Sequence, residues 1–296
     1  MDFETTIDRP VSVSGVGLHS GVKVNLRLMP ARSGTGVVFA RSDLDGFELP
    51  AIAKYIARVS YATSLMRQGV LLSTTEHLLS VFYSLGIDNV RVEIDNLELP
   101  ILDGSGRPFV EMIRKAGVRT LRKARKYLRV TTTVEVTEGK KTIAIHPADE
   151  FAITCKTDYG HELAGRQTLQ MVLTPEAYAA DIAPARTFGF EEDLDRMRDM
   201  GLIRGASLEN AVCIGPKGVL NPGGLRFPDE CCRHKVLDLI GDLALLGRPL
   251  LGHVVAEYAG HAMHTALVKK ILGNPSCFEL VGSHQLASKL EQQVAV

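Results

Sequence analysis

Residues 230–246 read ECCRHKVLDLIGDLALL, and they predict a helix that is apolar on nearly all of its faces. Asp229 precedes this segment as a candidate N-cap, and Gly-Arg-Pro at 247–249 ends it. A helix of this kind is typical of a buried position. The polar residues that it carries therefore need partners inside the protein.

His234 and Asp238 lie four residues apart in this segment, so on a helix they share one face and can bind a single metal ion. Asp242 extends the same face by one turn. A surface ion pair is the alternative for an isolated His-x-x-x-Asp pattern, but the apolar residues around it favour burial. A metal ion is one partner that a buried histidine and a buried carboxylate can share.

A second group of polar residues, Thr74-Thr75-Glu76-His77, begins a helix expected over 73–85. The metalloprotease pattern His-x-x-Glu-His would need a histidine where Ser73 stands, so this segment supplies one ligand, His77, and one free carboxylate. With two ligands from elsewhere the metal keeps an open position, as in catalytic zinc sites, and Glu76 can act as a base on the bound water. An exposed glutamate beside a packed histidine is the alternative.

Cysteines offer a competing metal site at Cys231 and Cys232, but adjacent residues on a helix point about 100° apart. We interpret them as buried thiols. The chain has five cysteines and no CxxC pattern. The odd number argues against a disulfide framework and predicts a reducing, cytoplasmic environment.

Charge and composition argue against several classes of function. Lys and Arg number 34 and so do Asp and Glu, so a net charge of zero gives no support to nucleic-acid binding. Tryptophan is absent, which weakens any interpretation based on base stacking. No apolar run approaches the roughly 20 residues of a membrane span, and the acidic start MDFE is not a signal peptide. A soluble globular protein is the expectation.

Hydrophobic periodicity predicts an α+β protein in two halves. Expected strands lie at 22–28, 90–94, 128–136, 142–145, 151–157 and 250–258, and expected helices at 73–85, 108–116, 191–200, 230–246 and 261–272. A basic segment at 114–129, with eight Lys or Arg and no acidic residue, separates the halves. It is interpreted as a solvated linker, with a patch for an anionic ligand or membrane surface as the alternative. We expect domains at 1–122 and 123–273 and a loose tail at 274–296.

Five motifs in this chain resemble those of one known enzyme family. They are TTEHLL (74–79), LPILDGS (99–105), ARTFGF (185–190), LRF (225–227) and HKxxDxIGDL (234–243), the last followed by Gly260-His261. In order and spacing they are similar to the UDP-3-O-acyl-N-acetylglucosamine deacetylases, the zinc enzymes of lipid A synthesis in Gram-negative bacteria. The resemblance runs from about residue 5 to residue 272.

The resemblance implies two α+β domains, each with a sheet and a pair of helices, with the helices sandwiched between the two sheets. It implies one catalytic Zn²⁺ bound by His77 from the first domain and by His234 and Asp238 from the second. Fe²⁺ is the alternative metal, because histidine and carboxylate accept both. The fourth position would take water or the substrate carbonyl.

Roles in hydrolysis of an acetamide are also implied. Glu76 would remove the proton of the attacking water, and Thr187 would donate its hydroxyl to the oxyanion. His261, as the imidazolium, would stabilise that charge or protonate the leaving amine, and Asp242 would orient His261 and hold it charged. The products would be acetate and UDP-3-O-acyl-glucosamine, in the committed step of lipid A biosynthesis.

The implied substrate is a UDP-sugar with one long acyl chain. Lys235 would face the diphosphate or the sugar, and Asp158 and Tyr159 the uridine, where tyrosine replaces the usual phenylalanine. Leu18 and His19 match a loop that approaches the site, and His19 is expected to bind a second metal adventitiously at most.

An apolar passage for the acyl chain is implied as well. Phe188, Ala206 and Ser207 match its walls, and Ala206 stands where family members often carry glycine, which would narrow the passage.

We expect a monomer that binds this small molecule, no nucleic acid, and a transient contact with the inner membrane surface.

Two other functions stay open at this point. A zinc amidase acting on another N-acetyl sugar or on a peptide would keep the three ligands and lose the uridine and acyl sites. A non-enzymatic module that binds sugar nucleotides or anions through the basic segment at 114–129 would have no need of Glu76.

Overall fold

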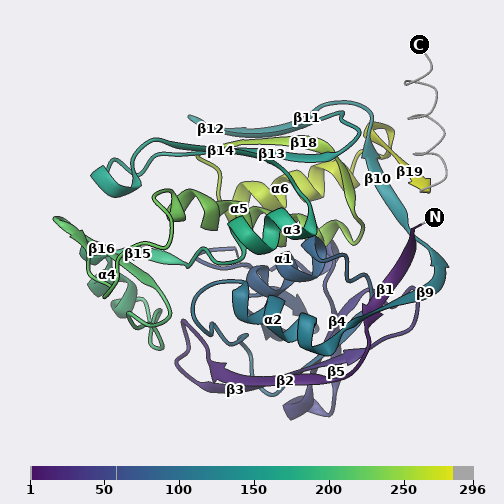
Figure 1. Ribbon diagram of the computed structural model, residues 1–296, viewed down its shortest axis with the longest axis horizontal. Coiled ribbons are helices and arrows are strands. Elements are labelled where there is room, and N and C mark those ends of the chain that lie inside the picture. The colour runs from purple at the N-terminus through teal and green to yellow at the C-terminus, as the bar shows by residue number, and fades with distance from the viewer. Residues whose placement is uncertain (1, 58, 283–296) are drawn as a thin grey trace.

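The computed structural model describes residues 2–57 and 59–282, and it places a layer of helices between two β-sheets (Figure 1). This layer contains α1 (Glu76–Ser84), α2 (Arg107–Ala116), α5 (Glu230–Leu243) and α6 (His261–Leu272). The mixed α and β content expected from the sequence is confirmed. Buried residues of both sheets and of all four helices form one hydrophobic core.

The first sheet lies below the helices in Figure 1 and has the strand order β2-β3-β8-β4-β5. Its strands are β2 (Val11–Val16), β3 (Lys23–Pro30), β4 (Val37–Arg41), β5 (Phe47–Pro50) and β8 (Val90–Ile94). β4 and β8 are parallel, whereas the other neighbours are antiparallel. Val24, Leu26 and Leu28 of β3 are buried and alternate with exposed residues, as in a strand with one face on the core.

The second sheet lies above the helices and is built around β18 (Leu250–Glu257). Its other strands are β10 (Lys126–Val130), β11 (Val134–Glu138), β12 (Lys141–His146), β13 (Phe151–Thr157), β14 (Gln167–Val172) and β19 (Phe278–Gly282). β18 is parallel to β10 and β13 and antiparallel to β12. The strand expected at 128–136 is therefore two strands, whereas that at 151–157 is confirmed as β13.

The basic segment at 114–129 is not a solvated linker. Beyond the end of α2 it forms β9 (Val118–Ala124), which pairs with β1 (Phe3–Ile7), and then β10 of the second sheet. The basic residues of β9 are exposed, so the strand carries no apolar period that would reveal it. The domain boundary predicted after residue 122 falls within β9.

The tail expected at 274–296 is ordered in its first part. Residues 278–282 form β19, which pairs antiparallel with β10 at the edge of the second sheet. Residues 283–296 lie outside the described part of the chain.

Two close-packed helices fix the geometry of the site. A Cβ atom added to Gly241 of α5 would lie 2.0 Å from the carbonyl oxygen of Glu76 on α1, so only glycine allows the two backbones to come this close. This contact brings the first turn of α1 against the middle of α5. Glu76 and His77 therefore lie next to His234 and Asp238.

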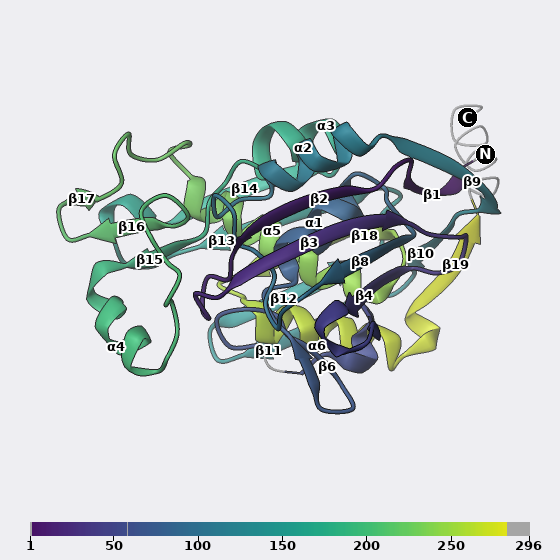
Figure 2. The same ribbon diagram turned by 90° about the horizontal axis from the view of Figure 1, so that it is seen from below.

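A smaller lobe extends from the end of the sandwich (Figure 2). It contains β15 (Phe188–Phe190), β16 (Val212–Gly215) and β17 (Gly218–Val219) in one sheet, together with α4 (Leu194–Asp199). A short helix, α3 (Pro175–Ala177), and a π-helical turn at Tyr178–Ile182 precede it in the chain. The hairpin β6 (Leu65–Arg67) and β7 (Val70–Leu72) precedes α1. Within the described residues, no helix is long and apolar enough to cross a membrane.

Candidate active site

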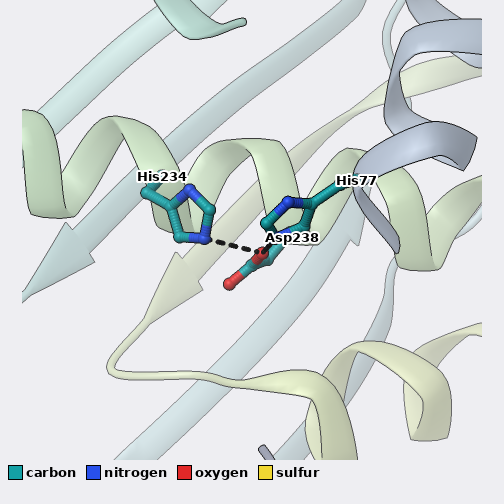
Figure 3. Close-up of side chains that lie close together, drawn as sticks. All are labelled: His77, His234 and Asp238. Carbon is teal, nitrogen blue, oxygen red and sulfur yellow. Dashed lines mark ion pairs between the residues drawn. The ribbon is translucent and has the colours of Figure 1, made fainter. Parts of the chain in front are cut away.

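Three side chains from α1 and α5 face one another inside the protein (Figure 3). Nε2 of His234 lies 3.4 Å from Oδ1 of Asp238, and Nε2 of His77 lies 3.8 Å from the same oxygen. All three side chains are buried, and their ligand atoms lie within 4.8 Å of one another. Two ligands of a tetrahedral ion with bonds of 2.0–2.1 Å lie about 3.4 Å apart, so the triad fits one metal ion with a small adjustment.

The protonation of this triad suits a metal. Burial, reinforced by His234, lowers the pKa of His77 to about 3, and burial lowers the pKa of His234 as well. Burial would raise the pKa of Asp238, but Lys235 and the nearby histidines outweigh it and hold the pKa well below its usual value. Nδ1 of His234 lies 3.1 Å from the carbonyl oxygen of Ala185, which leaves Nε2 free to bind an ion. Two neutral imidazoles and one carboxylate are a zinc-type donor set.

Glu76 lies beside the triad without being part of it. It is buried, and Oε2 accepts a hydrogen bond of 3.0 Å from the backbone N–H of Thr63. Burial raises the pKa of Glu76 to about 8; Asp238 and Asp242 act in the same direction and His261 opposes them. A carboxylate with a raised pKa is a stronger base than an exposed glutamate.

A second cluster joins α5 to the start of α6. Nδ1 of His261 lies 2.8 Å and Nδ1 of His264 lies 2.9 Å from the same oxygen, Oδ2 of Asp242. Burial would lower the pKa of His261, but the carboxylates of Asp242 and Asp238 outweigh it and raise the pKa to about 9. Burial lowers the pKa of His264, so the positive charge of the pair belongs to His261.

One cavity of about 610 Å³ connects these groups. The expected residues that line it are Leu18, His19, Glu76, His77, Thr187, Phe188, Ala206, Ser207, His234, Lys235, Asp238 and His261. Nζ of Lys235 donates a hydrogen bond of 2.7 Å to Oδ2 of Asp238 and lies 5.6 Å from the centre of the Phe188 ring. The amide of Thr187 donates to the carbonyl oxygen of Gly104 at 2.8 Å, which fixes Thr187 beside the cavity.

Three expected site residues do not line this cavity. Asp242 is fully buried, in hydrogen-bond contact with His261, which does line it. Asp158 is engaged in an ion pair with Arg166, 3.2 Å long. Tyr159 packs against Phe188 with ring centres 5.3 Å apart, so it lies one side chain away from the cavity.

Apolar residues of the small lobe line a further part of the cavity, and the sequence analysis did not identify them because they belong to no motif. They are Leu194, Met197, Ile203, Leu208, Ala211, Val212 and Cys213. The helix expected at 191–200 is present in part as α4, but the prediction of a helix does not show that Leu194 and Met197 line a cavity, and the other segments are too irregular for periodicity to identify. Tyr61, Arg198 and Arg204 also line the cavity.

Polar motif residues anchor the loops around the site. Glu230, at the start of α5, accepts hydrogen bonds from the backbone and side chain of Arg186 and from the amide of Arg226. Arg226 in turn donates to Asp103, 2.9 Å away, in the LPILDGS segment. This network ties the segment that carries Thr187 to α5 and to the first half of the chain.

The expected side-chain cap of Asp229 on α5 is wrong, and α1 also begins without a side-chain cap. Asp229 precedes α5, but its carboxylate accepts a hydrogen bond of 2.6 Å from Nε of Arg233 instead of capping the helix. Thr75 precedes α1, but its hydroxyl donates to the carbonyl oxygen of Thr63 at 3.1 Å. The start of α1 is therefore held by the segment that precedes the β6–β7 hairpin.

Of the seven non-glycine residues with a left-handed backbone in the described part of the chain, three line the cavity. Tyr61, Thr74 and Ile203 line it and have left-handed backbones, with φ of 63°, 57° and 50°. Tyr258, three residues before His261, has a φ of 57°. Non-glycine residues in this region cost energy and are typical of functional sites.

Comparison with known proteins identifies the family of the chain. The family profile of UDP-3-O-acyl N-acetylglycosamine deacetylase matches residues 4–273. A protein of Solibacter usitatus named UDP-3-O-acyl-N-acetylglucosamine deacetylase is 65% identical over 292 residues, 99% of each chain. A protein of the same name from Myxococcus xanthus is 45% identical over 279 residues, 94% of this chain and 89% of that one. The chain belongs to the family of UDP-3-O-acyl N-acetylglycosamine deacetylases.

Proposed function

We propose that the chain is a zinc-dependent deacetylase that hydrolyses the acetamide of UDP-3-O-(3-hydroxyacyl)-N-acetylglucosamine, the committed step of lipid A biosynthesis. One observation carries this proposal. A triad of His77, His234 and Asp238, with Glu76 beside it, lines a cavity whose remaining wall is largely apolar. The family name and the identity to deacetylases support the substrate.

The triad would hold the ion, and Zn²⁺ bound there would polarise the acetamide carbonyl and make water easier to deprotonate. Glu76 accepts the proton of the attacking water, and the hydrogen bond from the Thr63 amide orients its carboxylate. Attack of the water on the acetamide carbon produces an oxyanion. Thr187 and Lys235 line the cavity where that oxygen would lie, and Thr187 can donate a hydrogen bond to it.

His261 supplies the acid. With a pKa of about 9 it is charged at neutral pH, and Asp242 holds its Nδ1, so Nε2 is the nitrogen that can reach the substrate. The imidazolium stabilises the oxyanion and then donates a proton to the leaving amine. The C–N bond of the acetamide breaks, and acetate and the free amine are released.

The rest of the cavity suits the remainder of the substrate. The apolar side chains contributed by Leu194, Met197 and Ile203 provide a wall for the acyl chain. Lys235 is a cation for the sugar or the diphosphate. Tyr159, packed against Phe188, together with Asp158 is proposed to receive the uridine, outside the cavity itself.

An acetate-release assay tests the proposed substrate. We expect the zinc-loaded chain to cleave UDP-3-O-acyl-N-acetylglucosamine far faster than UDP-N-acetylglucosamine or free N-acetylglucosamine. Equal rates on all three would favour the alternative of a general zinc amidase. A Glu76→Gln chain, prepared in parallel, controls for contaminating deacetylases.

Several expectations about the whole molecule stay predictions. They are the two-domain organisation at 1–122 and 123–273, the monomeric state, the transient contact with the inner membrane and the cytoplasmic location. The five cysteines are buried, as expected for Cys231 and Cys232.

A further inference from the structure

Thr63 contacts both halves of the proposed acid–base machinery. It is fully buried and belongs to a segment, before the β6–β7 hairpin, that matches no motif. Its backbone faces Glu76, and its side chain faces Asp242 and His261. Thr63 and Asp242 are separated by 179 positions in the sequence, so this contact also joins the two halves of the chain.

The hydroxyl of Thr63 completes a closed group of hydrogen bonds. It donates to Oδ1 of Asp242 over 2.5 Å, and it lies 3.2 Å from Nδ1 of His261. Oδ2 of Asp242 accepts from His261 and from His264. Because the hydroxyl gives its proton to Asp242, its lone pairs can accept from the Nδ1–H of His261. Both carboxylate oxygens of Asp242 are therefore satisfied, and His261 has two acceptors on one side of its ring.

The backbone of Thr63 cannot rotate independently of α1. Its N–H donates to Oε2 of Glu76 at 3.0 Å. Its carbonyl oxygen accepts from the amide of Thr75 at 3.2 Å and from the Thr75 hydroxyl at 3.1 Å. Thr75 directly precedes Glu76, so the same residue that binds the glutamate carboxylate also holds the first turn of its helix.

We propose that Thr63 is a positioning residue that sets the relative placement of the general base Glu76 and the acid His261. This inference rests on the proposed function. The backbone of Thr63 fixes one group and its hydroxyl fixes the other, so substrate meets both at a constant separation. Preorganisation of this kind stabilises the transition state more than it stabilises the bound substrate, so it raises kcat more than it lowers KM.

Two pairs of variants isolate the hydroxyl. In the first pair, Thr63→Val removes the hydroxyl with little change in volume, whereas Thr63→Ser keeps it. The second pair, Thr63→Ser and Thr63→Ala, differs by the hydroxyl alone. Thr6→Val is the matched control. Thr6 belongs to β1, does not line the cavity and is also fully buried. Its hydroxyl accepts a hydrogen bond of 2.9 Å from the amide of Ala31. The kcat, KM, zinc content and melting temperature of each purified chain are measured.

We expect Thr63→Val to lower kcat about 10- to 100-fold, the effect of losing one hydrogen bond to a charged group, with KM and zinc content nearly unchanged. Thr63→Ser should stay within about threefold of the wild type and exceed Thr63→Ala by a similar 10- to 100-fold factor. Thr6→Val should lose thermal stability and keep its kcat. If Thr63→Val fails to fold, the Ser and Ala pair still decides.

A proton NMR measurement tests the contact without any substrate. The low-field ring N–H resonance of His261 is assigned by its loss in His261→Gln. Its chemical shift should change in Thr63→Val and stay at the wild-type value in Thr63→Ser. The proposal is overturned if Thr63→Val keeps the wild-type kcat, or if Ser and Ala at this position lower kcat equally. A wild-type chain that releases no acetate would instead refute the proposed function, and the resonance would still show whether Thr63 holds His261.

Discussion

His261 and Asp242 share a buried hydrogen bond, with Nδ1 2.8 Å from Oδ2 of the carboxylate. An isolated imidazole in so buried a place would lose its charge, because burial lowers the pKa of histidine. The carboxylates of Asp242 and Asp238 reverse this and raise the pKa of His261 to about 9. The charge state needed for an acid thus depends on Asp242, which does not itself line the cavity, as well as on Asp238, which does.

The pH dependence of kcat/KM should be bell-shaped. The acidic limb belongs to Glu76: activity rises with pH as this carboxyl ionises, and burial raises its pKa to about 8. The basic limb belongs to His261: its charged fraction falls as pH rises through about 9, so activity declines there. A cation at the triad favours the carboxylate of Glu76 and disfavours the imidazolium of His261, so it moves both limbs to lower pH. His261→Gln should lower the plateau and lose the basic limb, and the acidic limb should move to higher pH because the charge of His261 no longer lowers the pKa of Glu76. A folded, zinc-loaded His261→Gln chain with an unmoved basic limb would contradict the role of the imidazolium.

Removal of any ligand should remove the metal. His77→Ala, His234→Ala and Asp238→Ala each leave two protein ligands, too few for tight binding, so both zinc content and activity should be lost. His264→Ala is the comparison, since His264 is equally buried but contacts Asp242 and not the triad. Elemental analysis after dialysis measures the metal. A variant of the triad with full zinc and full activity would exclude that residue as a ligand.

Glu76→Gln should separate the base from the ligands. The amide keeps the size of the side chain and can still accept the hydrogen bond from Thr63, but it cannot take up a proton. We expect one zinc per chain and a loss in kcat of about 10²–10⁴. Loss of zinc in Glu76→Gln would make Glu76 a ligand and require a different base.

Gly241→Ala tests the packing that brings the two halves of the site together. The added Cβ would meet the carbonyl of Glu76 at 2.0 Å, so α1 and α5 must separate. Overpacking of this kind typically costs about 1–3 kcal/mol of folding free energy, and here it also moves His77 away from His234 and Asp238. Chemical denaturation should show a lower free energy of unfolding, and zinc titration should show a lower affinity for Zn²⁺. Gly282→Ala, where no atom of the described residues lies within 4 Å of the added Cβ, should be neutral, and equal behaviour of the two variants would refute the packing argument.

Local pattern was sufficient to predict the helices that carry the proposed metal ligands. The apolar run around His234 and Asp238 predicts α5, and the segment around Glu76 predicts α1. That these segments meet was known from resemblance alone, because the contact depends on Gly241 and on packing between distant parts of the chain. β9 and β19 escaped notice since exposed edge strands carry little apolar alternation.

Residues whose role depends on long-range contacts could not be predicted. Thr63 has no local pattern, and its partner Asp242 lies far away in the sequence. The apolar wall around Met197 and Ile203 comes from a lobe of short elements held by loops. Asp158 and Tyr159, expected from the resemblance, lie outside the cavity that is lined by His77, His234 and Asp238.

The most direct measurement is a zinc titration of the metal-free chain with UDP-3-O-acyl-N-acetylglucosamine as substrate. The metal-free chain should be inactive, and acetate release should rise linearly and reach its maximum at one Zn²⁺ per chain, because the triad of His77, His234 and Asp238 forms one site. A chelated, demonstrably zinc-free chain that still releases acetate at the full rate would contradict the account.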